Sequence, residues 1–193
     1  MKKNIFILFT LSLVVLLSAC DEKADTVKTD WQIAQDAGFE SITRKIGTEG
    51  YNSLPSKSNA GFIVYKEIID GNGAKPLFTD KAKILYTGWF KRDWSKGDTY
   101  INTEGQTVQN KVIFDSTSQR GDVPSTFPVA STSSNYGSSG IIDGMSTALQ
   151  NMEVGDKWEI WIPQELGYGS SAKSSIPAYT TLVFEIELLA VIK

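Results

Sequence analysis

The sequence predicts an α+β fold in which an antiparallel β-sheet of about five strands wraps on one short helix, preceded by a signal peptide and a tether. Three observations predict this organisation. Five short segments after residue 60 alternate apolar and polar residues or are rich in β-branched and aromatic residues. One segment of that region has a convincing helical pattern, and the apolar N-terminus is too short for a comfortable membrane span.

The N-terminus has the layout of a secretory signal, which we expect to occupy residues 1–19. Two lysines precede an uncharged stretch from Ile5 to Leu17, whose thirteen residues match the length of a signal-peptide core. The stretch ends in Leu17–Cys20, which resembles the lipobox of bacterial lipoproteins. That resemblance implies that Cys20 is lipidated and becomes the first residue of the mature chain. The alternative is an ordinary secretory signal with an incidental cysteine at its edge.

Residues 20–60 are expected to form a tether that contains a short helix. The acidic run Asp21–Asp25 is typical of a solvated segment, and a sorting signal is the alternative reading. Apolar residues within Trp31–Ala37 follow a weak helical pattern. The polar stretch Asn52–Asn59, with a proline in its middle, is typical of a linker.

The rest of the chain, residues 61–193, is expected to be one domain. Its predicted strands are Phe62–Ile69, Ala82–Gly88, Lys111–Phe114, Lys157–Ile162 and Leu182–Leu188. A helix is predicted from Asp143 to about Gln150, because Ile142, Met145, Leu149 and Met152 recur at helical spacing and Asp143 suits an N-cap or a first turn. In the last strand, Glu185 and Glu187 should face water while the alternate residues pack.

Composition excludes much catalytic chemistry. The chain has no histidine, so it cannot form a Ser-His-Asp triad, a Cys-His dyad or a histidine-ligated metal site. A single cysteine excludes an internal disulfide and a CxxC redox pair. The formal net charge of −3 argues against a nucleic-acid binder. We therefore expect neither a metal nor another cofactor.

Six short motifs occur in a specific order, although each alone is a weak signal. They are Tyr86-Thr87-Gly88, Phe114-Asp115-Ser116, Ile141-Ile142-Asp143-Gly144, Pro163–Gly169, Ile176-Pro177 and Thr181–Leu189. In this order they resemble the FKBP-type peptidyl-prolyl cis-trans isomerases over residues 61–193. The resemblance implies a curved antiparallel sheet over a short helix, which agrees with the independent reading of strands and helix.

The resemblance also implies an apolar pocket between sheet and helix. Its walls would be Tyr86, Phe114, Phe127, Ile141, Ile142 and Phe184, with Met145 as the floor and Ile176 at the rim. Asp115 and Tyr168 would supply polar contacts, and the backbone N–H of Ile142 would donate to a substrate carbonyl. Asp115, Tyr168 and Ile142 are thus the expected catalytic residues. For most of the wall residues, plain core packing is the alternative role.

The implied function is cis–trans isomerisation of X–Pro bonds in proline-containing polypeptides, as a folding helper in the bacterial envelope. Such a site needs no histidine, metal or nucleophile, because the twisted transition state forms without proton transfer or a covalent intermediate. The resemblance of Leu17–Cys20 to a lipobox implies that a lipid anchors the protein to a bacterial membrane, with the outer membrane or periplasm favoured. A non-catalytic binding module of the same fold, docking a partner protein, is the alternative.

Two departures from the family pattern concern the pocket and its surroundings. Many members carry a tryptophan where this chain has Met145, which casts doubt on tight macrolide binding more than on isomerase activity. An insertion occupies residues 89–113, and its aromatic residues are expected to form a small core of their own or, alternatively, a partner surface. A glycan-binding surface of Trp89, Trp94 and Tyr100 is a third reading. The flap from Ser116 to Gly140 is also long.

Overall fold

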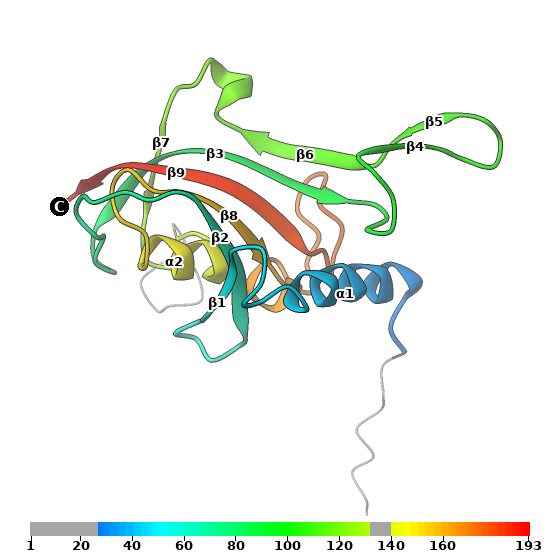
Figure 1. Cartoon of the computed structure of the whole chain (residues 1–193), viewed down its shortest axis with the longest axis horizontal. Helices are drawn as coiled ribbons and strands as arrows, with labels where there is room; N and C mark the ends of the chain where they lie inside the picture. Colours follow the sequence, from blue (N-terminus) through cyan, green and yellow to red (C-terminus); the bar gives the residue numbers. More distant parts are fainter. Residues whose placement is uncertain (1–26, 132–139) are drawn as a thin grey trace, which may run out of the picture.

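The computed structural model describes residues 27–131 and 140–193, and a seven-stranded antiparallel sheet forms its body (Figure 1). The strand order is β1-β2-β8-β9-β3-β6, and β7 pairs with β3 beside that path. The strands are β1 (Tyr51–Pro55), β2 (Phe62–Ile69), β3 (Lys81–Lys91), β6 (Lys111–Ser116), β7 (Ser125–Pro128), β8 (Lys157–Ile162) and β9 (Leu182–Ile192). Short 3-10 turns occur at Ser118–Arg120 (η1) and Gln164–Leu166 (η2).

The α+β fold class is confirmed, and each of the five predicted strands lies within one of these strands. The sheet has two strands that were not predicted, β1 and β7. Both are short and rich in polar residues, so neither shows an apolar alternation. The predicted helix is α2 (Asp143–Leu149), with Ile142 as its N-cap and Asp143 in its first turn. It lies under the sheet (Figure 1) and is buried along its whole length.

Alternation along the strands builds the core between the sheet and α2. In β3, every second residue from Ala82 to Phe90 is buried. The apolar residues of β8 and β9 that share this face pack on Met145 and Leu149 of α2 in the same cluster. Gly88 continues the β3 row without a side chain, because a Cβ there would lie 2.6 Å from the rings of Phe114 and Phe184. The buried row of β3 includes Tyr86, which lines the pocket described below.

The prediction of a tether is wrong for residues 30–55, because these residues belong to the folded domain. The helix α1 (Asp30–Thr43) is far longer than the weak pattern indicates, and the linker prediction overlaps β1, which pairs with β2 in register from Tyr51↔Lys66 to Pro55↔Phe62. The buried face of α1 carries Gln35, Gly38 and Ile42. Two of these three residues are not apolar side chains, which is why periodicity underestimates the helix.

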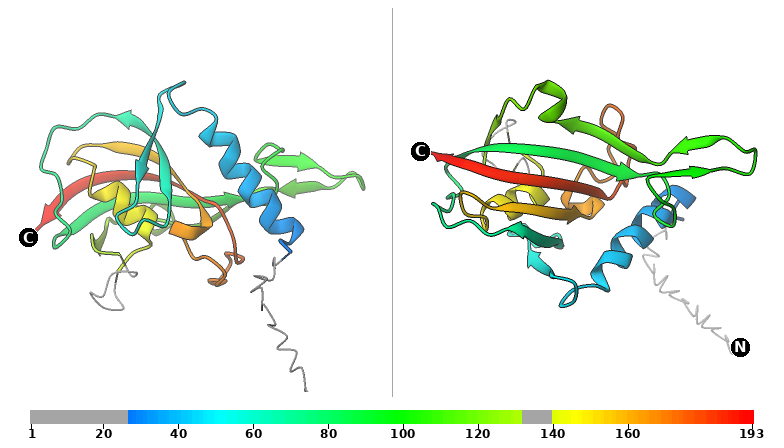
Figure 2. Two further views of the ribbon diagram at one scale, coloured as in Figure 1. Left: turned by 90° about the horizontal axis from the view of Figure 1, so that it is seen from below. Right: turned by 45° about the horizontal axis from the view of Figure 1, so that its top comes forward.

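The insertion is shorter than expected and does not form its own core. Strands β3 and β6 pair as far as Lys91↔Lys111, so residues 89–91 and 111–113 belong to the sheet. The remainder ends in a hairpin of β4 (Thr99–Ile101) and β5 (Thr107–Gln109), which projects beyond the sheet (Figures 1 and 2). Phe90 packs in the main core instead, and Trp94 packs on Trp161 at 4.9 Å between ring centroids.

The predicted signal peptide at residues 1–19, and Cys20 with it, lie outside the described residues. Within residues 27–131 and 140–193, no helix has the length and apolar character needed to cross a membrane.

Candidate active site

A pocket of about 530 Å³ lies where the sheet meets the N-terminus of α2. Four strands contribute its sheet side, and the other side comes from the segment before α2 and from the loop after η2. The lining residues are Tyr86, Asp115, Phe127, Gly140, Ile141, Ile142, Met145, Gly167, Tyr168, Lys173 and Phe184. The cavity is therefore mostly apolar and aromatic, with a few polar groups at defined places, as small-ligand sites generally are.

Eight of the ten predicted pocket residues lie in this lining, and Phe114 and Ile176 do not. Phe114 stands behind the wall, with its ring edge-on to Phe184 at 5.4 Å between centroids. Ile176 is 5% exposed and packs into the main core rather than standing at the rim. Both residues belong to or pack against the hydrophobic cluster of the domain, and their part in substrate binding stays a prediction.

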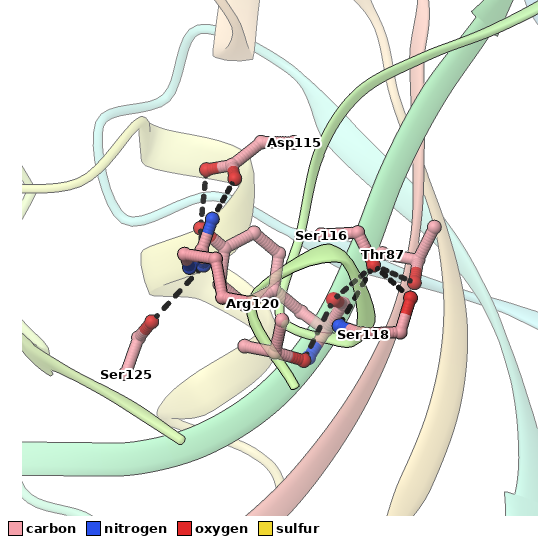
Figure 3. Close-up of polar contacts among 8 residues, drawn as sticks. Thr87, Asp115, Ser116, Ser118, Arg120 and Ser125 are labelled. Carbon is pink, nitrogen blue, oxygen red and sulfur yellow. Dashed lines mark hydrogen bonds and ion pairs between the residues drawn. The ribbon is translucent and has the colours of Figure 1, made fainter. Parts of the chain in front are cut away.

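Tyr86, Asp115 and Arg120 form one hydrogen-bonded group, here called the polar wall (Figure 3). Both the Tyr86 hydroxyl and the Arg120 guanidinium donate to the Asp115 carboxylate, and Arg120 also donates to the Tyr86 hydroxyl at 3.3 Å. Burial disfavours the charged form of Asp115, but these two donors outweigh it and hold the pKa of the carboxyl below its ordinary value. Asp115 is thus a fixed, ionised acceptor.

Thr117 anchors the backbone of Tyr86, the central residue of the polar wall. Its side-chain hydroxyl accepts from Tyr86 N–H at 3.0 Å and donates to Tyr86 C=O at 3.1 Å. Ser116, which is 1% exposed, shares hydroxyl contacts with Thr87 and Ser118 (Figure 3). Because the main chain is bonded on both sides, the tyrosine hydroxyl is presented to Asp115 from a fixed position.

Ile142 N–H and the Tyr168 hydroxyl form a second side, here called the donor wall. Ile142 has extended backbone angles (φ −62°, ψ 150°) just before α2, so its N–H precedes the intrahelical ladder. Neither this N–H nor the Tyr168 hydroxyl donates a hydrogen bond to another described residue. Burial, followed by the negative charge of Asp115, raises the pKa of Tyr168, which keeps its hydroxyl protonated and able to donate.

The floor of the pocket is Met145, which is 5% exposed and belongs to both the core and the lining. The long, unbranched side chain of methionine adapts to what lies above it. Phe127 stands edge-on to Tyr86 at 5.8 Å and closes the side of the cavity next to β7. Together these side chains present an apolar surface to the cavity.

Sequence reasoning missed Arg120, Gly140, Gly167 and Lys173. Arg120 follows Asp115 by five residues on a polar loop, and an arginine so close to a predicted pocket carboxylate was the available signal. Lys173 lies in the polar loop after Tyr168 and is exposed at the pocket. Gly140 and Gly167 indicate turns in the sequence and nothing more specific about a pocket. Among the described residues, no group of three or more carboxylates and cysteines is arranged to hold a metal ion.

The family model described as FKBP-type peptidyl-prolyl cis-trans isomerase matches residues 74–189. This chain belongs to that family. Its curated relatives include the FKBP-type 22 kDa peptidyl-prolyl cis-trans isomerase of Escherichia coli, which is 35% identical over 173 residues, covering 89% of this chain and 68% of the relative. FkpA of Aeromonas hydrophila is 34% identical over 159 residues, which cover 82% of this chain and about half (47%) of that relative.

Solved structures of the family have the same fold. A peptidyl-prolyl cis-trans isomerase from Pseudomonas syringae aligns with a TM-score of 0.57 at 25% identity, covering 86% of this chain and 99% of that one. FkpA from Escherichia coli aligns with a TM-score of 0.59 at 27% identity, covering 84% of this chain and 61% of that one. The expectation of an FKBP-type isomerase is therefore confirmed, and α1 and β1 precede the residues that the family model matches.

Proposed function

We propose that this pocket catalyses cis–trans isomerisation of X–Pro bonds in polypeptides and that the protein assists folding in the bacterial envelope. The observation that carries the proposal is an apolar cavity whose polar wall is bonded internally, while the two donors of its donor wall have no hydrogen-bond acceptor among residues 27–131 and 140–193. Family membership supports the same activity.

Rotation about a peptide bond meets a barrier of about 18–20 kcal/mol because the planar amide is stabilised by resonance. The twisted transition state has lost that resonance, and its carbonyl is less polar. The apolar side chains of Phe127, Met145 and Phe184 solvate the planar, polar form less well than water does, so the cavity favours the twisted form by comparison. The reaction requires neither proton transfer nor a metal ion.

The two walls have different tasks in this mechanism. The proline ring enters over Met145 and is enclosed by the aromatic side chains. Ile142 N–H and the Tyr168 hydroxyl donate to substrate carbonyls and so fix the peptide on both sides of the rotating bond. Asp115 keeps Tyr86 and Arg120 in place, which preserves the shape of the opposite side during turnover.

A proline-containing tetrapeptide tests this function directly. The full-length chain in detergent should accelerate its cis-to-trans conversion, which otherwise takes tens to hundreds of seconds. The alternative, a binding module that docks a partner protein, predicts that peptides bind in the pocket without faster conversion. Absence of acceleration at saturating protein would reject the enzymatic proposal and favour that alternative.

We further propose that a lipid on Cys20 anchors the protein to a bacterial membrane, in the outer membrane or periplasm. The resemblance of Leu17–Cys20 to a lipobox supports this, and one relative, 34% identical over 145 residues, is the outer membrane protein MIP of Legionella longbeachae. Several acyl chains would give a stable anchor. Full-length protein should enter the detergent phase with added acyl mass, and Cys20→Ser should not; an unmodified wild-type chain would refute the anchor.

A further inference from the structure

Gln35 of α1 is a fully buried amide that connects three separate parts of the molecule. Its Nε2 donates to the carbonyl oxygen of Lys91, where β3 ends, at 2.9 Å. Its Oε1 accepts from Trp94 Nε1 of the insertion at 3.0 Å and from Thr181 N–H at 3.2 Å. The Thr181 hydroxyl also donates to the backbone carbonyl of Gln35 at 2.9 Å. These hydrogen bonds join α1 to the end of β3, to the insertion and to the start of β9.

Thr181 ends the segment that begins with Tyr168 of the donor wall, residues 168–181, here called the pocket loop. A second residue of α1 bonds this loop, because Trp31 Nε1 donates to Ala178 C=O at 3.0 Å. The indole ring of Trp31 stands edge-on to Phe90 at 6.1 Å, which fixes the ring against the main core. The helix therefore holds the C-terminal part of the pocket loop at two points.

The pocket loop has a backbone that needs external support. Ser174 and Tyr179 adopt left-handed φ values of 48° and 58°, which non-glycine residues take up only when their surroundings impose them. Tyr179 lies directly after the Trp31 contact at Ala178, and its N–H donates to Gly169 C=O at 2.7 Å. Gly169 adjoins Tyr168, so the restraint from α1 reaches the catalytic hydroxyl through one backbone hydrogen bond.

We infer that α1 is a positioning element of the active site, in which Trp31 and Gln35 hold the pocket loop so that Tyr168 faces the cavity. Both residues lie before residues 74–189, so the device is an addition to the part of the chain that the family model matches. The inference rests on the proposed function, because the position of Tyr168 matters for turnover only if the pocket is an isomerase site.

Trp31→Phe in the full-length chain tests the inference, since it removes the indole N–H and keeps a ring against Phe90. Tyr51→Phe on β1 is the matched control: it also removes one hydrogen bond of an aromatic side chain, the 3.0 Å contact from the Tyr51 hydroxyl to Glu159, but none to the pocket loop. We expect kcat/KM to fall roughly two- to tenfold in Trp31→Phe, the range for one lost hydrogen bond, and to stay unchanged in the control.

Amide hydrogen exchange supplies a readout that does not depend on activity. Exchange across residues 168–181 should accelerate in Trp31→Phe and not in Tyr51→Phe, while both variants melt within a few degrees of each other. Unchanged loop exchange, or an unchanged kcat/KM despite faster exchange, would overturn the inference. If the wild type itself shows no turnover, the proposed function fails, whereas the exchange experiment still decides whether α1 restrains the loop.

Discussion

The two walls of the pocket differ in where their hydrogen bonds go. In the polar wall, Tyr86, Asp115 and Arg120 bond one another, and Thr117 bonds the main chain of Tyr86. In the donor wall, Ile142 N–H and the Tyr168 hydroxyl donate to no described residue, although both adjoin the cavity. The hydrogen-bonding groups of the polar wall therefore fix its shape, whereas the two donors of the donor wall are available to a substrate.

This difference predicts different penalties when each wall is altered. Removing the Asp115 carboxylate takes the acceptor from the hydroxyl of Tyr86, a residue that is only 8% exposed, which is more damaging than losing a bond that water can replace. Removing a donor from the donor wall leaves nothing unpaired until the substrate binds. The following predictions sharpen or break this contrast.

Asp115→Asn should have the largest effect. It removes the charge that pairs with Arg120 and weakens the acceptor for Tyr86. Because hydrogen bonds to charged groups contribute about 1.5–3 kcal/mol, we expect kcat/KM to fall roughly tenfold to a hundredfold. The exposed Asp122, on the loop that follows β6, offers a matched control, and Asp122→Asn should retain wild-type kcat/KM in the same peptide assay. Equal losses in the two variants would refute a specific role of the polar wall.

Met145→Trp changes the floor and leaves both walls intact. A larger, flatter ring covering about 40–80 Å² more of a bound macrolide should add roughly 1–2 kcal/mol, and thus tighten binding about five- to thirtyfold in titration calorimetry. Catalysis should change less, because a floor contact made equally in the ground and transition states does not lower the barrier. A variant that melts like the wild type and binds no tighter would show that Met145 does not contact the ligand.

Tyr168→Phe should lower kcat/KM by about two- to twelvefold, the value of one lost hydrogen bond of about 0.5–1.5 kcal/mol. Stability should hardly change, because the hydroxyl has no partner among the described residues. Tyr100→Phe, on the β4–β5 hairpin, removes the same group far from the pocket and is the control. A loss of stability in Tyr168→Phe, measured by thermal unfolding, would contradict the free-donor description of this wall.

The smallest expected effect is that of pH. The pKa of Asp115 lies below its ordinary value of 3.8, whereas the pKa values of Tyr86 and Tyr168 lie above 10.0, so none of these groups titrates from about pH 5.5 to 8. Turnover should vary less than about twofold there. Ionised Asp115 stabilises the fold above its ordinary pKa, and this contribution should disappear as pH falls through the lowered one. A steep change of kcat/KM near neutral pH, with the fold intact by circular dichroism, would contradict the mechanism.

The main sheet was largely predictable from local patterns, whereas the pocket residues were implied by the resemblance to the FKBP family. Alternation marked β3, β8 and β9, and the ordered motifs placed Asp115, Ile142 and Tyr168 around one cavity. The helix α1 was underestimated because its buried face carries Gln35 and Gly38. Gln35 is satisfied by partners far along the chain, and a Cβ at Gly38 would lie 2.3 Å from Trp94. Apolar periodicity reflects only the spacing of apolar side chains, so it does not reveal a buried polar residue whose hydrogen-bond partners lie far along the chain.

Edge strands escaped prediction for a related reason. β1 is an edge strand that has β2 as its neighbour in the sheet, and Pro55 at its end lacks the N–H that a central strand would use. Arg120 was missed because its role arises when η1 folds the polar loop back over Asp115 and Tyr86.

Exchange NMR on a proline-containing peptide at equilibrium tests the central claim most directly, because it observes binding and isomerisation in one sample. With the wild-type full-length chain, we predict cis–trans exchange cross-peaks on a sub-second timescale. The Asp115→Asn/Tyr168→Phe double variant should lose most of this exchange. Peptide-induced shifts at the pocket residues without any exchange above the uncatalysed rate would contradict the claim, and would show instead a pocket that binds peptides without isomerising them.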